Sequence, residues 1–136
     1  MDSALRQFVR SRARQRCEYC RLHAEDEPDA PFHIEHIIAR QHRGPTTIDN
    51  LSLACAHCNL HKGTNLVGRD PSTGEMVRLF HPRNDRWKEH FRRREERIEG
   101  ISEIGRTTAE LLQFNSPINL LQRRSILERK GRLDQE

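Results

Sequence analysis

The spacing of apolar residues predicts an amphipathic helix at the start of the chain, over residues 3–15. Four apolar residues fall on one face of this helix, with arginines on the opposite face: Leu5, Phe8, Val9 and Ala13. Ser3 stands where an N-cap is expected, because a serine hydroxyl can accept a hydrogen bond from an amide of the first turn.

The middle of the chain predicts two short strands followed by a helix. Residues 32–38 and residues 51–54 each form a short strand-like run. Residues 55–62 have the pattern of a helix that Gly63 ends. Glycine, proline and an Asp-Asn pair mark residues 40–50 as the loop between the two strands.

The last third of the chain predicts mostly helices after a turn-rich connection or hairpin over residues 68–76. A helix is expected over residues 83–91, with Trp87 and Phe91 four residues apart on the face that plugs the core. Two further helices are expected to begin at recognisable start signals: a capping box at residues 107–110 and the pair Ser116-Pro117.

This pattern divides the chain into two parts. We expect residues 1–66 to form a core that includes the N-terminal helix, and residues 67–136 to form a mainly helical C-terminal extension packed on it. The arginines of residues 92–94 are balanced by nearby glutamates, so they are expected on a solvated helix face.

Composition indicates that the core is thin. Hydrophobic residues make up 34% of the chain and charged residues 32%, and a small domain with so few apolar residues usually needs a disulfide or a metal as a staple. The formal net charge of +4 favours polyanionic partners, nucleic acid above all.

The sequence also bears on the compartment. No apolar run approaches the roughly 20 residues that span a bilayer, and the N-terminus lacks the apolar stretch of a signal peptide. We therefore expect a cytoplasmic protein, and in that compartment paired cysteines hold metal more often than they form disulfides.

All four cysteines occur in two Cys-x-x-Cys pairs, which predicts a zinc site. Tetrahedral Zn²⁺ takes four soft ligands, and each pair supplies two thiolates at a suitable bite. Four protein thiolates leave no open position for water or substrate, so the predicted site is structural. Its expected ligands are Cys17, Cys20, Cys55 and Cys58.

The segment between and after the cysteine pairs carries further chemistry: Ile34-Glu-His-Ile37, then Asp49-Asn-Leu51, then Cys58-Asn-Leu-His-Lys-Gly63. In this order and spacing, the motifs resemble those of the HNH endonuclease family. The resemblance covers Cys17 to about Gly63. It implies an α+β fold with a small ββα-metal (His-Me finger) core, in which two strands and a helix surround one metal ion.

The chemistry of these residue types also suits phosphodiester hydrolysis, independently of the family resemblance. A histidine that titrates near neutral pH can take a proton from water. Carboxylate and amide oxygens suit Mg²⁺ or Mn²⁺, and a lysine can hold a phosphate oxygen.

The resemblance implies a role for each motif residue. His36 would be the general base, and Asn50 would orient its ring through a hydrogen bond, although Asn50 could also cap a turn. Glu35 and Asn59 would be ligands of the catalytic metal. Lys62 would contact phosphate, and it shares a helix face with Asn59 because the two are three residues apart.

One geometric condition applies to these roles. Adjacent residues of a regular strand point to opposite faces, so Glu35 and His36 can serve one site only if the strand ends or bulges there. The alternative places His33 and Glu35 on the metal face. His61 is left open between a DNA contact and a solvent-exposed residue.

The sequence therefore predicts a metal-dependent endonuclease that hydrolyses DNA, double-stranded DNA above all, as a monomer or a homodimer. By the resemblance, its products would carry a 3′-hydroxyl and a 5′-phosphate. The alternative is a non-catalytic, zinc-stabilised module that binds nucleic acid. A RING-type interaction module is a weaker fit, because ligands in clear spacing exist for only one zinc ion.

Overall fold

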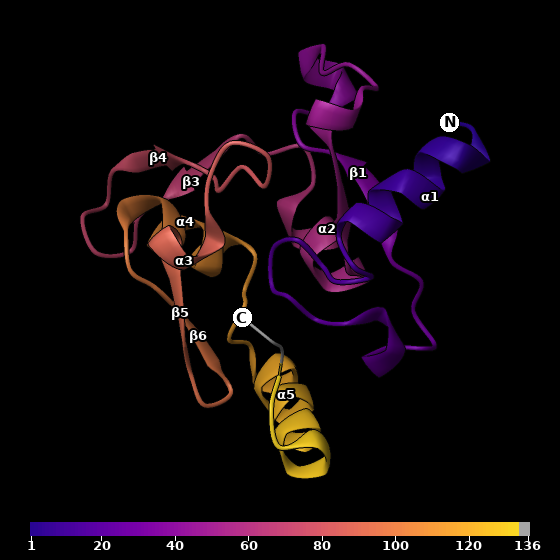
Figure 1. Ribbon diagram of the computed structural model, residues 1–136. Helices are drawn as coiled ribbons and strands as arrows, with labels where there is room; N and C mark the ends of the chain where they lie inside the picture. Colours follow the sequence, from indigo (N-terminus) through magenta and orange to yellow (C-terminus); the bar gives the residue numbers. More distant parts are fainter. Residues whose placement is uncertain (134–136) are drawn as a thin grey trace. The chain divides into compact units, whose positions relative to one another are not determined.

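The computed structural model describes residues 1–133 and combines helices with short antiparallel strand pairs (Figure 1). This mixture confirms the expected α+β class. The chain divides into two compact units. Unit 1 comprises residues 1–66 and 81–85, and unit 2 comprises residues 67–80 and the chain from residue 86 onward.

Unit 1 contains one strand pair, two α-helices and short 3₁₀ turns. In chain order, its elements are α1 (Ser3–Arg12), η1 (Ala24–Asp26), β1 (His33–His36), η2 (Arg40–His42), η3 (Ile48–Asn50), β2 (Leu51–Ala54) and α2 (Ala56–Lys62). The strands β1 and β2 are antiparallel, with Glu35 opposite Ser52 and His36 opposite Leu51. The two strands and the helix expected between residues 32 and 63 therefore form.

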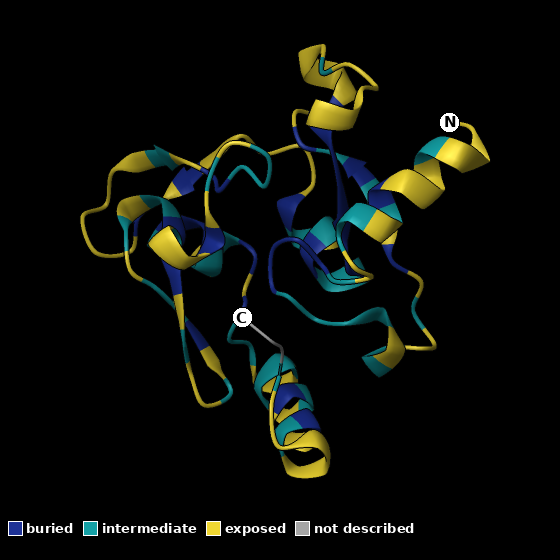
Figure 2. Cartoon of the chain, viewed as in Figure 1, coloured by how far each residue is buried: buried dark blue, intermediate teal, exposed yellow. Residues whose placement is uncertain are grey.

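Helix α1 buries one position and exposes most of the others (Figure 2). Val9 is fully buried, whereas Phe8 is 46% exposed. The N-cap is Asp2 and not Ser3, because the Asp2 carboxylate accepts a hydrogen bond from the Leu5 amide at 2.8 Å. The helix ends earlier than expected, since Arg14 has a positive φ of 55°.

The strand β2 is buried along its whole length, and the helix α2 follows it at once. Cys55 is the N-cap of α2 and Gly63 its C-cap, as the sequence pattern predicts for a helix that ends at this glycine. The segment 81–85 also belongs to unit 1. Within it, Arg83 forms an ion pair with Glu18 and donates a hydrogen bond to the Leu51 carbonyl at 3.3 Å.

Unit 2 combines two hairpins with helices. In chain order, its elements are β3 (Val67–Arg69), β4 (Met76–Arg78), α3 (Trp87–His90), β5 (Phe91–Arg94), β6 (Arg97–Gly100), α4 (Glu103–Leu111) and α5 (Pro117–Lys130). Strand β3 pairs with β4, and β5 pairs with β6, both antiparallel. The turn-rich stretch at residues 68–76 is thus a hairpin.

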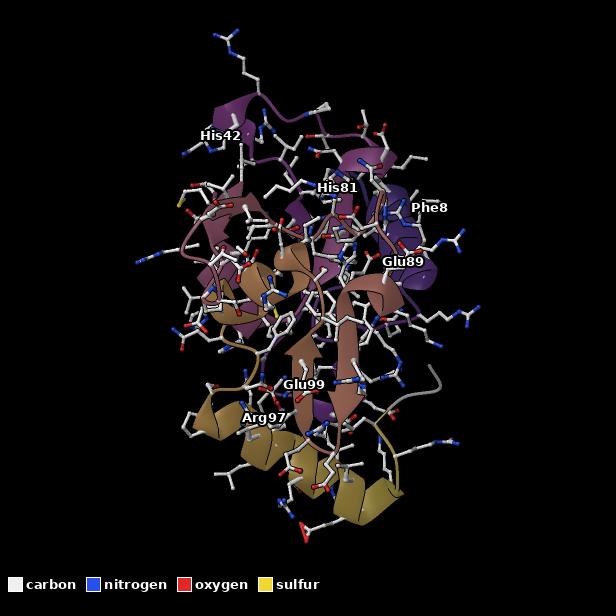
Figure 3. The ribbon with its side chains drawn as sticks, turned by 90° about the vertical axis from the view of Figure 1, so that its left-hand side faces the viewer. Phe8, His42, His81, Glu89, Arg97 and Glu99 are labelled. Carbon is white, nitrogen blue, oxygen red and sulfur yellow. The ribbon has the colours of Figure 1, made fainter. Side chains whose placement is uncertain are left out.

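The helix expected over residues 83–91 is wrong, because only the single turn α3 forms and the chain continues as a hairpin. The reason is an alternation of period two, which buries Phe91 and Ile98 and leaves Arg92 and Arg94 exposed on the other face. Arg92 pairs with Glu99 across the strands at 3.1 Å. Arg92 and Arg94 are therefore solvated on a strand, whereas Arg93 is half-buried and its guanidinium lies over the Trp87 ring, 5.6 Å from the ring centroid. Glu99 lies on this hairpin with Arg97 (Figure 3).

An aromatic cluster forms the core of unit 2, with Phe91 at its centre. The ring of Phe91 lies 5.1 Å from Trp87, 5.3 Å from Phe80 and 5.5 Å from Phe114, measured between centroids. Such tilted and edge-on contacts are favourable for aromatic rings. Trp87 and Phe91 thus belong to the core, as their spacing predicts.

The helix α4 begins before the expected capping box. Its N-cap is Ser102, whose hydroxyl accepts a hydrogen bond from the Gly105 amide at 2.9 Å. Thr107 and Thr108 lie inside the helix and are fully buried, and the Thr108 hydroxyl accepts a hydrogen bond from the Phe80 amide. The last helix, α5, does begin at Ser116-Pro117 with Ser116 as its N-cap.

Within residues 1–133, no helix is both long enough and apolar enough to cross a membrane.

A matched pair of isoleucines tests the core of unit 2. Ile98 is fully buried and Ile118 is 72% exposed. We expect Ile98→Ala to lower the free energy of unfolding by about 2–5 kcal/mol, and Ile118→Ala to change it by less than about 0.5 kcal/mol. Urea titration followed by the fluorescence of Trp87, the single tryptophan, measures both. Equal stability of the two variants would contradict this core.

Candidate functional site

The four cysteines converge on one point in unit 1. Their sulfur atoms all lie within 4.8 Å of one another, and every one of these residues is buried. The Sγ atoms of Cys20 and Cys55 are 3.7 Å apart, close to the ~3.8 Å that a tetrahedron with Zn–S distances of about 2.3 Å requires. The arrangement therefore fits the predicted structural zinc site.

The electrostatics of the cluster also call for a cation. Hydrogen bonding with the thiols of Cys17 and Cys20 raises the pKa of Cys55 well above its usual value, and burial raises the pKa of Cys58. Four buried thiols so close together ionise only when a positive charge compensates them, and a bound Zn²⁺ would supply that charge. Amides also point at sulfur, since the Cys58 amide donates to the Cys55 Sγ at 3.4 Å.

The two spacer residues of the first cysteine pair connect the zinc cluster to the strands. Glu18 is buried and accepts a hydrogen bond from the Leu53 amide of β2 at 2.9 Å. Tyr19 is also buried, and its hydroxyl donates to Oε2 of Glu35 in β1 at 2.6 Å. The knuckle that contributes two cysteines to the cluster thus also binds both strands of the predicted site.

Glu35 lies in a buried polar network. Its Oε2 accepts hydrogen bonds from the hydroxyls of Tyr19 and Ser52, at 2.6 and 2.8 Å. Its Oε1 forms an ion pair with Nζ of Lys62 at 3.1 Å. Burial, followed by the charge of Glu35, raises the pKa of Tyr19 well above its usual value, so this hydroxyl stays a donor.

Lys62 is buried with Glu35. Its side chain is 2% exposed, and its ammonium also donates to the carbonyl of Ile37 at 2.9 Å. The structure thus places Lys62 against the acid of the motif and against the end of β1, where it neutralises a buried carboxylate.

His36 lies at the last position of β1 and is half-buried. Its ring Nε2 is 2.8 Å from the hydroxyl of Thr46. Among residues 1–133, no hydrogen-bond partner of its Nδ1 is found. Strand β1 ends at His36, as a shared site for Glu35 and His36 would require. The Glu35 side chain, however, is directed into the buried network.

Asn50 fastens the loop that carries Thr46. Its Oδ1 accepts a hydrogen bond from the Ile38 amide at 2.9 Å. Its Nδ2 donates to the carbonyls of Ile38 and Pro45, at 3.0 and 2.9 Å. The Asn50 side chain therefore hydrogen-bonds only to backbone groups in these contacts. It affects the His36 ring indirectly, by holding the segment that carries Thr46.

The other motif residues are less constrained. Asn59 lies on α2 and is half-buried, and its side-chain amide has no hydrogen-bond partner within residues 1–133. His61, also on α2, bonds through Nδ1 to the carbonyl of His57 at 2.9 Å, and their ring centroids are 4.1 Å apart. His33 is exposed at the start of β1.

Sequence reasoning missed several residues that shape this site. Tyr19 and Ser52 fix the carboxylate of Glu35, Thr46 holds the ring of His36, and Arg83 pairs with Glu18. Ser52 could have been found, because it faces Glu35 in the register of two adjacent strands. Arg83 gave no signal, since it is distant in sequence from the residues it contacts.

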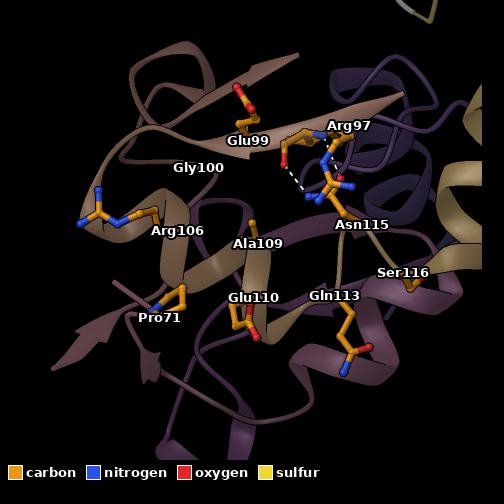
Figure 4. A pocket seen from close by; sticks show the side chains of 11 residues that line it. Pro71, Arg97, Glu99, Gly100, Arg106, Ala109, Glu110, Gln113, Asn115 and Ser116 are labelled. Atoms are coloured by element: carbon orange, nitrogen blue, oxygen red, sulfur yellow. Dashed lines mark hydrogen bonds between the residues drawn. The ribbon is translucent and has the colours of Figure 1, made fainter. Parts of the chain in front are cut away.

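Unit 2 contains a groove of about 490 Å³ beside β6 and α4 (Figure 4). Its polar side chains are largely engaged within the unit. Arg106 pairs with Asp70 at 2.8 Å, and Asn115 exchanges two hydrogen bonds with the backbone of Ile98. Because acidic and basic side chains both line this groove, it points to no single class of ligand, and the candidate chemistry lies in unit 1.

Residues 17–65 match the family model described as HNH endonuclease. This segment contains the four converging thiols together with β1, β2 and α2. The match confirms the resemblance expected from the sequence and connects this part of the chain with nucleic-acid chemistry. No curated protein and no solved structure matches the chain.

The zinc cluster gives a direct prediction. We expect the purified chain to contain one Zn²⁺ and Cys58→Ser to lose it, because three remaining thiolates hold the ion less well and zinc binding contributes folding free energy. Elemental analysis measures the metal, and circular dichroism measures the fold. Ser125→Ala, at an exposed position of α5, is the control and should keep its zinc. Full zinc content in Cys58→Ser would rule out this ligand set.

The role of Asn50 gives a second prediction. Asn50→Ala removes three hydrogen bonds to the segment 38–45, so we expect a loss of about 1–3 kcal/mol in stability. Hydrogen exchange of residues 38–46 should become faster. Asn65→Ala serves as the matched control, because Asn65 is exposed and bonds to the carbonyl of Lys62 within its own turn. Unchanged exchange in Asn50→Ala would show that other contacts hold this segment.

Proposed function

We propose that this chain is a metal-dependent nuclease that hydrolyses phosphodiester bonds of DNA, with His36 as the general base. The observation that carries the proposal is the setting of His36. Its ring is half-buried at the end of β1 and held through Nε2 by Thr46, and the preceding residue, Glu35, has a carboxylate that is fixed by two hydroxyls. The match of residues 17–65 to the HNH endonuclease model supports it.

The local architecture supports the same proposal. An antiparallel pair, β1 and β2, leads directly into α2, and the cysteine cluster ties the pair to the N-terminal knuckle. We assign these elements to a ββα-metal core. Residues 67–133 would then serve as an extension of this core.

Proton transfer falls to His36. When Nε2 carries the proton and donates it to the Thr46 hydroxyl, Nδ1 presents a lone pair. This nitrogen can then accept a proton from the water that attacks phosphorus. Asn50 contributes by holding the segment on which Thr46 lies, so the ring stays oriented.

Glu35 and Asn59 are the residues that would hold a divalent metal ion. Their carboxylate and amide oxygens are the hard ligands that Mg²⁺ and Mn²⁺ prefer. An ionised carboxylate offers about four acceptor sites, and in Glu35 three of them are taken by Tyr19, Ser52 and Lys62. The remaining site is on Oε1, beside Lys62. When bound there, the ion would stabilise charge on the departing oxygen.

DNA is the substrate that the charge of the chain fits best. The net charge is +4, and exposed arginines flank the His36 loop at Arg40 and Arg43. Contact with phosphate neutralises such charges and favours binding. A phosphate contact by Lys62 requires that its ammonium leave Glu35. The four reduced thiols required for zinc agree with a cytoplasmic setting.

Supercoiled plasmid tests the function. We expect metal-dependent nicking by the wild type and a loss of about 10²–10⁴-fold in His36→Ala, because a general base contributes that factor. His33→Ala is the control, since His33 is exposed on the same strand, and it should nick at the wild-type rate. Elemental zinc and circular dichroism should be unchanged in both variants.

The other outcomes separate the alternatives. Loss of activity in His33→Ala would favour the pairing of His33 with Glu35 at the metal. DNA binding without cleavage, under Mg²⁺ and Mn²⁺ alike, would support the non-catalytic zinc module. Equal nicking by the wild type and His36→Ala would remove His36 from the mechanism.

A further inference from the structure

The ammonium group of Lys62 sits in a cage of oxygen atoms. Glu35 Oε1 is 3.1 Å from Nζ, the carbonyl of Ile37 is 2.9 Å away and the carbonyl of His36 is 3.5 Å away. The side chains of Lys62 and Glu35 are 2% and 6% exposed. A buried carboxylate with converging carbonyls is an environment suited to a cation.

Lys62 differs in this respect from the other two lysines of the chain. Lys88 and Lys130 are exposed, as lysines usually are, because an ammonium group loses its hydration when it is buried. The burial of Lys62 is therefore compensated by Glu35. Conversely, Glu35 needs a cation at Oε1, because its two hydroxyl partners both bind Oε2.

The same oxygens have the chemistry of a site for a hard divalent ion. Mg²⁺ and Mn²⁺ are bound by carboxylates and carbonyl groups. Because Oε2 already accepts two hydrogen bonds, an ion reaching Glu35 approaches Oε1, where the ammonium group lies. Two cations in contact with one oxygen repel each other strongly in a buried site.

We propose that Lys62 competes with the divalent metal ion for Oε1 of Glu35 and thereby sets the metal affinity of the site. Lys62 is then a positioning residue: it balances the charge of Glu35 until an ion takes its place. Displacement frees the ammonium from the carboxylate, so that phosphate contact by Lys62 is linked to metal binding. This inference rests on the proposed function, since it assumes that the nuclease metal binds Glu35.

Direct metal binding tests the competition without reference to activity. Mn²⁺ is titrated into the zinc-loaded full chain, and electron paramagnetic resonance measures free Mn²⁺ for the wild type, Lys62→Met, Lys88→Met and Glu35→Gln. Methionine keeps most of the apolar length of the lysine stem and removes the charge. Lys88→Met makes the same change of charge at an exposed position.

We expect Lys62→Met to bind Mn²⁺ at least about tenfold more tightly than the wild type, because the competing charge in contact with Oε1 is gone. Lys88→Met should bind as the wild type does, and Glu35→Gln should lose this binding. Equal or weaker binding in Lys62→Met, with the Glu35 dependence intact, overturns the competition and leaves the metal role of Glu35 standing. If neither the wild type nor Lys62→Met binds Mn²⁺ more tightly than Glu35→Gln does, the proposed metal site is overturned as well.

A measurement on the wild type covers the case in which Lys62→Met does not fold, as judged by zinc content and circular dichroism. Amine acylation followed by mass spectrometry reports the reactivity of each lysine, with Lys88 and Lys130 as exposed internal references. Saturating Mg²⁺ should raise the labelling rate of Lys62 severalfold relative to these references. An unchanged relative rate for Lys62 overturns the proposal.

Discussion

The convergence of four buried thiols is the constraint on which unit 1 depends. The cluster joins a knuckle near the end of α1 to the start of α2, and the chain between the two cysteine pairs contains β1, β2 and the loop between them. The spacer residues between Cys17 and Cys20 extend this effect, because Glu18 binds the backbone of β2 and Tyr19 binds Glu35. The cysteine cluster and its spacer residues thus position the polar groups around Glu35.

The site itself uses both faces of a four-residue strand. Glu35 is directed inward, where two hydroxyls and an ammonium group surround its carboxylate. His36 is directed to the other side and meets Thr46. This division separates two environments: the inner face holds a buried, paired carboxylate, and the outer face carries a half-buried imidazole. Strand β1 ends at His36, so the two environments belong to consecutive residues.

Local signals predicted unit 1 better than unit 2. The strands around residues 33–36 and 51–54 and the helix before Gly63 were predicted, because cysteines, turn residues and a helix-ending glycine mark their bounds. The helix over residues 83–91 was wrong, since Trp87 and Phe91 satisfy a helical spacing and also the packing of a turn followed by a strand. The start of α4 was misplaced because Ser102 caps the helix ahead of a threonine pair that the core buries.

The sequence by itself determined the four-cysteine cluster, the resemblance to the HNH endonuclease family and the α+β class, because cysteine pairs and short motifs are encoded in residue type and spacing. Only the tertiary structure decided what each motif residue touches. In the structure, Lys62 forms an ion pair with Glu35. Asn50 hydrogen-bonds to the backbone of a loop and not to the His36 ring. Those contacts arise from the register of two strands and the approach of a helix, and spacing along the chain does not contain them.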